Sequence, residues 1–423
     1  MLASIARLPG VLAQNWPALL AWYLSGALVR AAVIALAAPV GPQSALAALL
    51  LVPIAVLARL VSYIGMFLVV RRGLRTYGSL TGEWPERQSF RESLEEFLRI
   101  LLATILPFFT LYGLIGLLGE DLSAYARAAF RYSLGSERGV LDVGDGPLVL
   151  GVVLVAFGGR LLLKYFGNRL PEWLKLVGVY LDATWVFVSL TALGALFGAV
   201  ISWVEQRRVV DWVLDGRAWL SGLWEPIEAA FVAVDGAVPV VLQVLLLPGA
   251  WLLIAGAIYL GSLSHLAEER IVPVRVEAAL RARLARLPRL LQRRAQVAAD
   301  DWSEVWAPLS SAGRLILRSG PVDLAVFAAA YGLLYAAGQW LARGLYAAIG
   351  AHDSLFWFTV DPIASLAVNS VVEPVRIVLL AVAFDRCLAL LRAAQSPRGN
   401  RSRVPSRSVS PEADSAMSTV APS

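Results

Sequence analysis

Residues Ser264–Gly320 read SHLAEERIVPVRVEAALRARLARLPRLLQRRAQVAADDWSEVWAPLSSAGRLILRSG and form the longest polar interruption in an otherwise apolar chain. The segment contains ten arginines, and long apolar runs precede and follow it. Loops rich in Arg and Lys are retained in the cytoplasm, so their positions set the direction in which membrane helices cross. The segment, called the basic loop from here on, therefore predicts the topology of the chain.

The composition is typical of an integral membrane protein. Of the 423 residues, 58% are hydrophobic and only 16% are charged, whereas a soluble domain carries about 25% charged residues. All basic residues except Lys164 and Lys175 are arginine, a bias that is typical of a GC-rich bacterial genome. Lipid offers no water to an open backbone, so we expect an all-α integral membrane protein in a bacterial cytoplasmic membrane.

Eight apolar runs reach the length of about 20 residues that a helix needs to cross a bilayer. The first run is predicted to be a retained span rather than a cleaved signal peptide, because Arg30 interrupts it and a second run follows closely. A count of six or ten would follow if a run were re-entrant or interfacial. The predicted spans lie near residues 17–40, 45–70, 98–119, 147–166, 174–203, 238–263, 321–341 and 374–391.

The loops alternate in charge, and this alternation predicts that both termini and the basic loop are cytoplasmic. Amphipathic segments rich in acids are expected on the opposite, extracytoplasmic side at 120–146, 205–237 and 342–373. Each joins two spans, but the three resulting hairpins share no residue-level similarity that would mark them as repeats. Residues 1–394 are thus predicted to form one polytopic membrane domain, and the Ser, Pro and Arg-rich tail 395–423 is expected to be disordered.

The basic loop is predicted to contain an amphipathic helix that Pro288 bends. Such a helix would lie on anionic inner-leaflet lipid headgroups or dock a membrane or cytoplasmic protein. A nucleic-acid partner is disfavoured, because no aromatic side chains alternate with the arginines. The helix would carry leucines on one face and arginines on the other: Leu280, Leu284, Leu287 and Leu291 against Arg281, Arg286, Arg289 and Arg293.

Charged residues inside the predicted spans are costly if they face lipid, so each should face a partner or water. We expect Asp182 to pair with Arg160 or Lys164, and Arg30 to pair with Glu373 or Asp361. The charges could serve helix pairing, or they could form a path for an ion, a proton or a lipid headgroup. The candidate residues are Arg30, Arg59, Arg160, Lys164, Asp182, Asp323, Glu373 and Arg376.

Neither a catalytic motif nor a cofactor motif is present. The chain lacks a Gly-rich phosphate loop, an H-E-x-x-H motif and a G-x-S-x-G motif, and Cys387 is its only cysteine. We therefore expect no enzyme, no cofactor and no metal. The first hypothesis is a scaffold or accessory subunit of a cell-envelope or membrane assembly, and the second is a transporter or channel. A polar cavity lined by Asp182, Asp323 or Arg59 would favour transport, whereas a closed, paired bundle would favour the scaffold.

Overall fold

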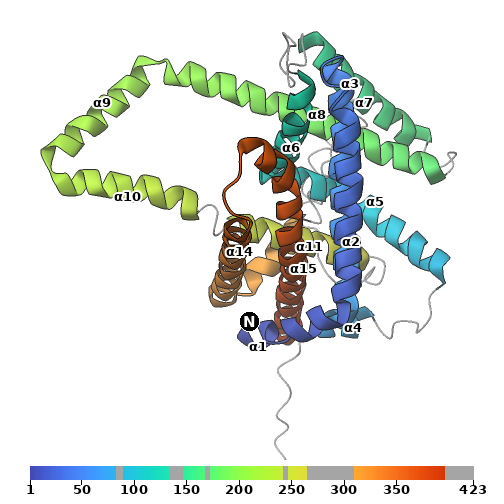
Figure 1. The fold of residues 1–423 in the computed structure, drawn as a ribbon. Coiled ribbons are helices and arrows are strands. Elements are labelled where there is room, and N and C mark those ends of the chain that lie inside the picture. The colour runs from blue at the N-terminus through green and yellow to red at the C-terminus, as the bar shows by residue number, and fades with distance from the viewer. Residues whose placement is uncertain (82–88, 134–145, 167–171, 242–245, 264–308, 396–423) are drawn as a thin grey trace, which may run out of the picture.

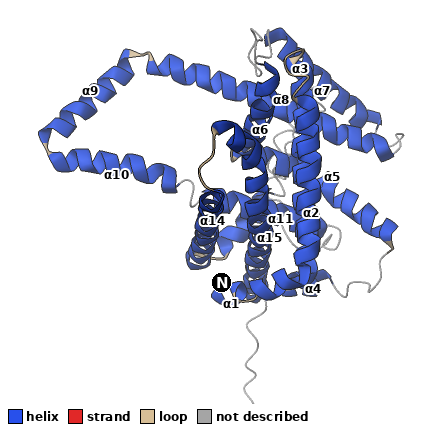
Figure 2. Ribbon diagram, in the orientation of Figure 1, coloured by secondary structure: helices blue, strands red, loops and turns tan. Residues whose placement is uncertain are grey.

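The computed structural model describes the chain except for residues 82–88, 134–145, 167–171, 242–245, 264–308 and 396–423. Every element in the described residues is a helix (Figure 2), which confirms the all-helical fold for that part of the chain. Three helical stretches there are long and apolar enough to cross a membrane, and a bent pair of helices would add a fourth. The predicted basic-loop helix and the tail lie outside the described residues.

The described residues form a succession of helices. In order they are α1 (Leu2–Ile5), α2 (Leu8–Ala37), α3 (Ala45–Val70), the short 3₁₀ helix η1 (Arg71–Gly73), α4 (Arg75–Thr81), α5 (Phe90–Leu114), α6 (Leu117–Ser133), α7 (Gly146–Phe166), α8 (Glu172–Glu205), α9 (Arg208–Leu223), α10 (Glu225–Val241), α11 (Leu247–Leu263), α14 (Pro321–Ile349) and α15 (Ser354–Gln395).

Local sequence signals define several helix ends. The Ser44 hydroxyl accepts a hydrogen bond from the backbone N–H of Ala47 at 3.3 Å, so it caps the start of α3. Gly320 has a φ of 90°, and Pro321 then begins α14, where a missing N–H costs nothing. These two starts coincide with the starts of the predicted spans 45–70 and 321–341.

α2 and α3 pack closely through two glycines. A Cβ atom at Gly26 would lie 2.3 Å from Cβ of Ser62, and one at Gly65 would lie 2.4 Å from the Trp22 ring. The Ser62 hydroxyl also donates to the Trp22 carbonyl at 2.7 Å. Small residues let two helix backbones approach, and a hydrogen bond between helices adds to the packing.

Aromatic side chains fill the core where α3, α5, α11 and α15 meet. Trp251 and Tyr63 contact each other edge to face, with ring centroids 5.3 Å apart, and Phe108 packs against both rings. Farther along, Tyr259 stacks on Phe384 at 5.6 Å. All five side chains are at most 1% exposed, so this cluster holds the four helices together.

The long helices do not all run in one direction. In Figure 1, α2 and α15 stand upright, whereas α8 crosses that direction and leads into α9 and α10. These two helices project away from the others as an arm and are joined by an ion pair between Arg217 and Asp235. The side chains of Trp212 and Trp219 are more than 60% exposed on α9. The predicted amphipathic segment 205–237 therefore corresponds to α9 and to most of α10.

Several predicted boundaries differ from the structure. The predicted span 238–263 begins inside α10, which ends at Val241, and its remainder corresponds to α11, which begins only at Leu247. The helix in the predicted span 98–119 ends at Leu114, because Gly116 adopts a φ of 84° and α6 leaves α5 at an angle of 76°. The segment 342–373 is not a loop, since α14 continues to Ile349 and α15 begins at Ser354. α15 then runs through Pro362 and Pro374 without ending. A proline removes one backbone donor, and packing of α15 against its neighbours offsets this loss.

Candidate functional site: a charged network between α3, α6 and α15

The network is centred on Arg59, which lies near the middle of α3. At a rise of 1.5 Å per residue, Arg59 is about 21 Å from the start and about 17 Å from the end of this helix. Tyr63 follows one turn later and therefore lies on the same face. The Nε atom of Arg59 donates to the Tyr63 hydroxyl at 3.2 Å, so the two side chains act as one polar unit.

Asp121 joins two arginines on different helices. Nε of Arg30, on α2, donates to Oδ1 of Asp121 at 2.7 Å, and an Nη atom of Arg59 lies 3.3 Å from the same oxygen. The Tyr112 hydroxyl donates to Oδ2 of Asp121 at 2.5 Å and accepts from Arg59 at 2.8 Å. The carboxylate of Asp121 is completely buried, so α6 holds α2, α3 and α5 together through one shared anion.

Glu120 extends the network to the surface. Its carboxylate is 60% exposed and lies 3.4 Å from the Arg59 guanidinium. The neighbouring residues Glu120 and Asp121 therefore hold the same arginine from an exposed and from a buried position. This arrangement gives Arg59 two anionic partners, while its side chain remains 21% exposed.

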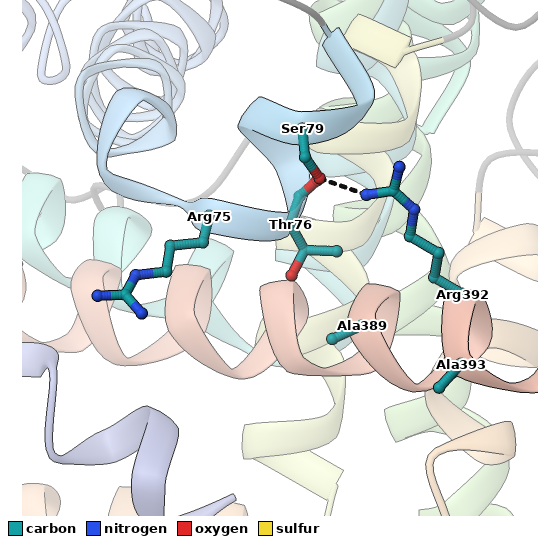
Figure 3. Close-up of a pocket in the computed structure, with 6 residues that line it drawn as sticks. All are labelled: Arg75, Thr76, Ser79, Ala389, Arg392 and Ala393. Carbon is teal, nitrogen blue, oxygen red and sulfur yellow. Dashed lines mark hydrogen bonds between the residues drawn. The ribbon is translucent and has the colours of Figure 1, made fainter.

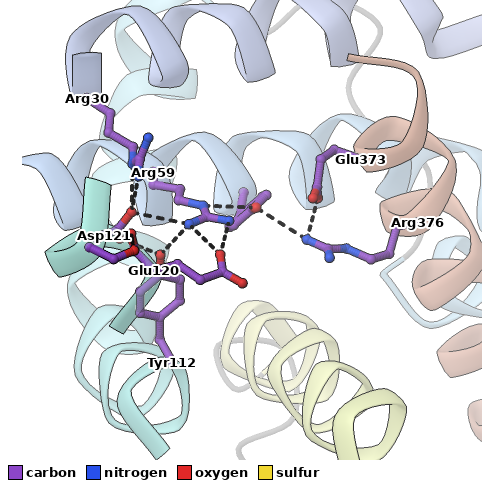
Figure 4. Close-up of polar contacts among 9 residues, drawn as sticks. Arg30, Arg59, Tyr112, Glu120, Asp121, Glu373 and Arg376 are labelled. Carbon is purple, nitrogen blue, oxygen red and sulfur yellow. Dashed lines mark hydrogen bonds and ion pairs between the residues drawn. The ribbon is translucent and has the colours of Figure 1, made fainter. Parts of the chain in front are cut away.

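Tyr63 carries the network across to α15. Its hydroxyl accepts a hydrogen bond from Arg376 at 3.3 Å in addition to the bond from Arg59 (Figure 4). Arg376 also forms an ion pair with Glu373, one turn earlier on α15, and its guanidinium lies 4.1 Å from the centroid of the Trp251 ring. Figure 4 shows a continuous series of polar contacts from Arg30 to Glu373.

The charges of the network balance. Three arginines, Arg30, Arg59 and Arg376, meet three carboxylates, Asp121, Glu120 and Glu373. Both the Glu373 and Arg376 side chains are less than 15% exposed, so each would be costly without the other. Chemically, the network links five helices by ion pairs and tyrosine hydrogen bonds. It presents hydroxyl, guanidinium and carboxylate groups in succession, from an exposed edge at Glu120 to a buried end at Glu373.

The structure brings together four of the eight predicted charges: Arg30, Arg59, Glu373 and Arg376. Arg160 and Asp182 form a separate ion pair between α7 and α8, which is one of the two pairings considered for Asp182. The alternative partner Lys164 lies on α7, but its side chain is outside the described part of the structure.

Asp323 lies apart from the network, at the start of α14. It accepts from the Met1 amino group at 2.8 Å and lies 3.4 Å from Nε of Arg386. The predicted docking residues of the basic loop, from Leu280 to Arg293, fall outside the described residues, and the structure places none of them.

The predicted partners of Arg30 are wrong. Arg30 pairs with Asp121, whereas Glu373 pairs with Arg376 and Asp361 accepts from the Tyr346 hydroxyl at 2.5 Å. The charge pattern alone places Asp121 in a polar outer segment that begins at Glu120. The bend at Gly116 instead turns α6 back against α2 and α3. The sequence does contain a signal for such a partner. Arg30 and Arg59 lie inside the first two predicted spans, where no carboxylate is present, so a carboxylate from another segment had to meet them.

Comparisons with known proteins assign no function to this arrangement. The chain matches no family model, and neither a curated protein nor a solved structure shows significant similarity to it. Function must therefore be inferred from the charged network and from the surfaces around it.

Proposed function

We propose that this chain is a non-catalytic multi-pass membrane protein that serves as a scaffold or accessory subunit of a bacterial membrane or cell-envelope assembly. One observation carries the proposal: charges at the centre of the helices are used to join helices to one another. Arg59 and Arg376 each have carboxylate and tyrosine partners on the chain itself. A network of this kind fixes helix positions and leaves recognition to the surfaces.

The proposed placement has eight spans in the cytoplasmic membrane, with both termini and the basic loop inside. The long apolar helices α2, α3 and α14 support membrane insertion by their length and composition. The arginines that follow α3, and those in the basic loop and after α15, support the orientation. In this placement the arm formed by α9 and α10 lies on the extracytoplasmic side.

The basic loop is the proposed surface for partners. Its leucine face would rest on lipid or on another protein, and its arginines would meet anionic lipid headgroups or acidic side chains. The chain devotes one continuous segment to this charge, while most charges in the helical core are already paired.

Co-purification after cross-linking in native membranes tests the scaffold role. The full chain should retain a partner in a fixed stoichiometric ratio, and deletion of residues 274–297 should release it. Deletion of residues 400–423 removes the same number of residues and should leave the partner bound. A wild-type chain without any stoichiometric partner would contradict the scaffold. A partner that survives the 274–297 deletion would contradict docking through the basic loop.

A transporter or channel is the second candidate, and one observation favours it. The network runs without interruption from the exposed carboxylate of Glu120 to the buried carboxylate of Glu373. A chain of hydroxyl, guanidinium and carboxylate groups in a membrane is the kind of arrangement along which protons or ions move. In this reading Glu373 is the inner acceptor of the path.

Flux measurements in proteoliposomes separate the two candidates. A transporter should move protons or small ions across vesicles that contain a pH-sensitive or potential-sensitive dye, and Glu373→Gln should abolish this flux without loss of folded protein. Glu228→Gln, which changes an exposed glutamate on α10, is the matched control. A scaffold should give no flux above that of empty vesicles, and Glu373→Gln should instead lower the yield of folded protein.

A further inference from the structure

The carboxylate of Asp121 is surrounded by the kind of donors that bind a free anion. Nε of Arg30 donates to it at 2.7 Å, an Nη atom of Arg59 lies 3.3 Å away, and the Tyr112 hydroxyl donates at 2.5 Å. These three donors belong to α2, α3 and α5, whereas the carboxylate belongs to α6 (Figure 4). Two guanidinium groups and a hydroxyl that converge on one point suit a carboxylate or a phosphate.

α6 packs against α2 and α3 along one narrow face. Its buried residues include a row with intervals of four, which therefore lies on one side of the helix: Leu117, Asp121, Tyr125 and Ala129. At Tyr125 the fit is close, because a Cβ atom at Gly41 would lie 2.5 Å from the Tyr125 hydroxyl oxygen. Asp121 is the charged member of this row, so its ion pairs attach α6 to α2 and α3.

The junction between α5 and α6 can act as a hinge. α5 ends at Leu114, and the chain turns by 76° before α6 continues from Leu117. Gly116 in this turn has a φ of 84°, and among the described residues no packed side chain lies within 4 Å of the position that its Cβ would take. Glycine adopts positive and negative φ values with similar ease. The junction therefore allows α6 to turn as a unit away from α2 and α3.

We propose that Arg30, Arg59 and Tyr112 form a binding site for a carboxylate or phosphate group, which Asp121 occupies while α6 is packed. When α6 turns away about Gly116, the Asp121 carboxylate leaves and a free anion of the same chemistry enters. The two arginine side chains are already 25% and 21% exposed, so the site is close to the surface. The site does not depend on the scaffold or transport role. An anionic lipid headgroup and a soluble anion are the two sources of this chemistry.

Hydrogen–deuterium exchange of the full chain in mild detergent tests the hinge. Alanine rarely adopts a φ of 84°, so Gly116→Ala should depopulate the packed position and raise exchange within residues 117–133 by about 5–30-fold. Gly119→Ala adds the same methyl group inside α6, where nothing lies within 4 Å, and should not raise exchange. Exchange within α3 should stay unchanged in both variants. Equal exchange of α6 in the two variants, or a rise throughout the chain, would contradict movement about Gly116.

Chemical rescue tests whether the three donors bind a free anion. Asp121→Ala removes the internal carboxylate and leaves the donors in place, so the Tm should fall. Sodium acetate or sodium phosphate should restore most of the lost Tm in a saturable manner, whereas sodium chloride at equal ionic strength should not. Asp121→Ala combined with Arg30→Ala is the matched control and should not respond, because one of the two charged donors is missing.

The same measurements distinguish the sources of the anion. Restoration of the Tm by phosphatidylglycerol, but not by phosphatidylcholine, acetate or phosphate, would assign the site to an anionic lipid headgroup in the proposed membrane placement. Restoration by acetate or phosphate alone would assign it to a soluble anion. In the wild type, a bound anion competes with Asp121 and should raise exchange within residues 117–133. If no anion raised this exchange or restored the Tm of Asp121→Ala, the proposal would be overturned.

Discussion

At the scale of single residues, Asp121 and Tyr63 decide how the buried charges are arranged. Asp121 lets Arg30 and Arg59 share one carboxylate, and Tyr63 accepts from Arg59 and Arg376 through a single oxygen. Removing an arginine from water costs several kcal/mol unless an anion and further hydrogen bonds replace its hydration. The two acceptors provide this replacement for three arginines that lie on three different helices.

Asp121→Asn should destabilise the folded protein by about 2–3 kcal/mol, because it leaves Arg30 and Arg59 without their buried anion. The cost is placed below the full value for a buried pair, since the two arginine side chains are 25% and 21% exposed. Thermal unfolding in detergent, followed by tryptophan fluorescence, should show a lower Tm. Asp215→Asn, at an exposed aspartate on α9, should leave the Tm unchanged. An equal Tm for both variants would mean that Asp121 does not stabilise the network.

At the scale of elements, the contact between α2 and α3 depends on close backbone approach. The two helices pack side by side with glycines at the crossing, and the aromatic core lies on the other face of α3. Association of apolar helices in a membrane gains little from the hydrophobic effect, so packing and hydrogen bonds between helices carry more of the stability. A single methyl group at the crossing should therefore have a measurable effect.

Gly65→Ala should destabilise the protein by about 1–3 kcal/mol, because the added Cβ would overlap the Trp22 ring. Gly10→Ala adds the same methyl group to α2, where nothing lies within 4 Å, and should stabilise the helix by about 0.5–1 kcal/mol. The opposite signs can be read from the Tm values of the two variants under identical detergent conditions. A similar rise in Tm for both variants would show that α2 and α3 do not approach each other in this way.

At the scale of the whole molecule, the chain allows a direct test of topology, because it has a single cysteine and that cysteine is buried. In a Cys387→Ser background, single cysteines at Gly222, Ser354 and Ser79 sample the arm, the start of α15 and α4. A membrane-impermeant maleimide applied from outside should label Gly222→Cys and Ser354→Cys but not Ser79→Cys. Labelling of both Ser79→Cys and Ser354→Cys would contradict the proposed orientation. If Gly222→Cys stayed unlabelled while Ser354→Cys was labelled, the proposed crossing of the membrane by α8 would be contradicted.

The sequence by itself determined the helical class and several element bounds. The apolar run at 45–70 is bounded by Ser44 and by the arginines from Arg71 onward, and α3 occupies the same residues. These features are local, since hydrophobic length, capping groups and glycine or proline act within a few residues of where they stand. The pairing of Arg160 with Asp182 could be predicted for a related reason. α7 and α8 are consecutive helices that pack as a hairpin, so residues on them lie close together.

Only the tertiary structure decided which charges on distant helices meet. Arg30 and Asp121 are 91 residues apart, and their contact depends on the bend at Gly116, on the rotation of α6 and on the packing of α2 against α3. A pocket between α4 and α15, lined by Arg75 and Arg392 among others (Figure 3), likewise unites residues that are far apart in the sequence. Pairing between distant residues follows from the mutual orientation of whole helices. That orientation is set by the sum of many packing contacts, and no single spacing in the sequence records it.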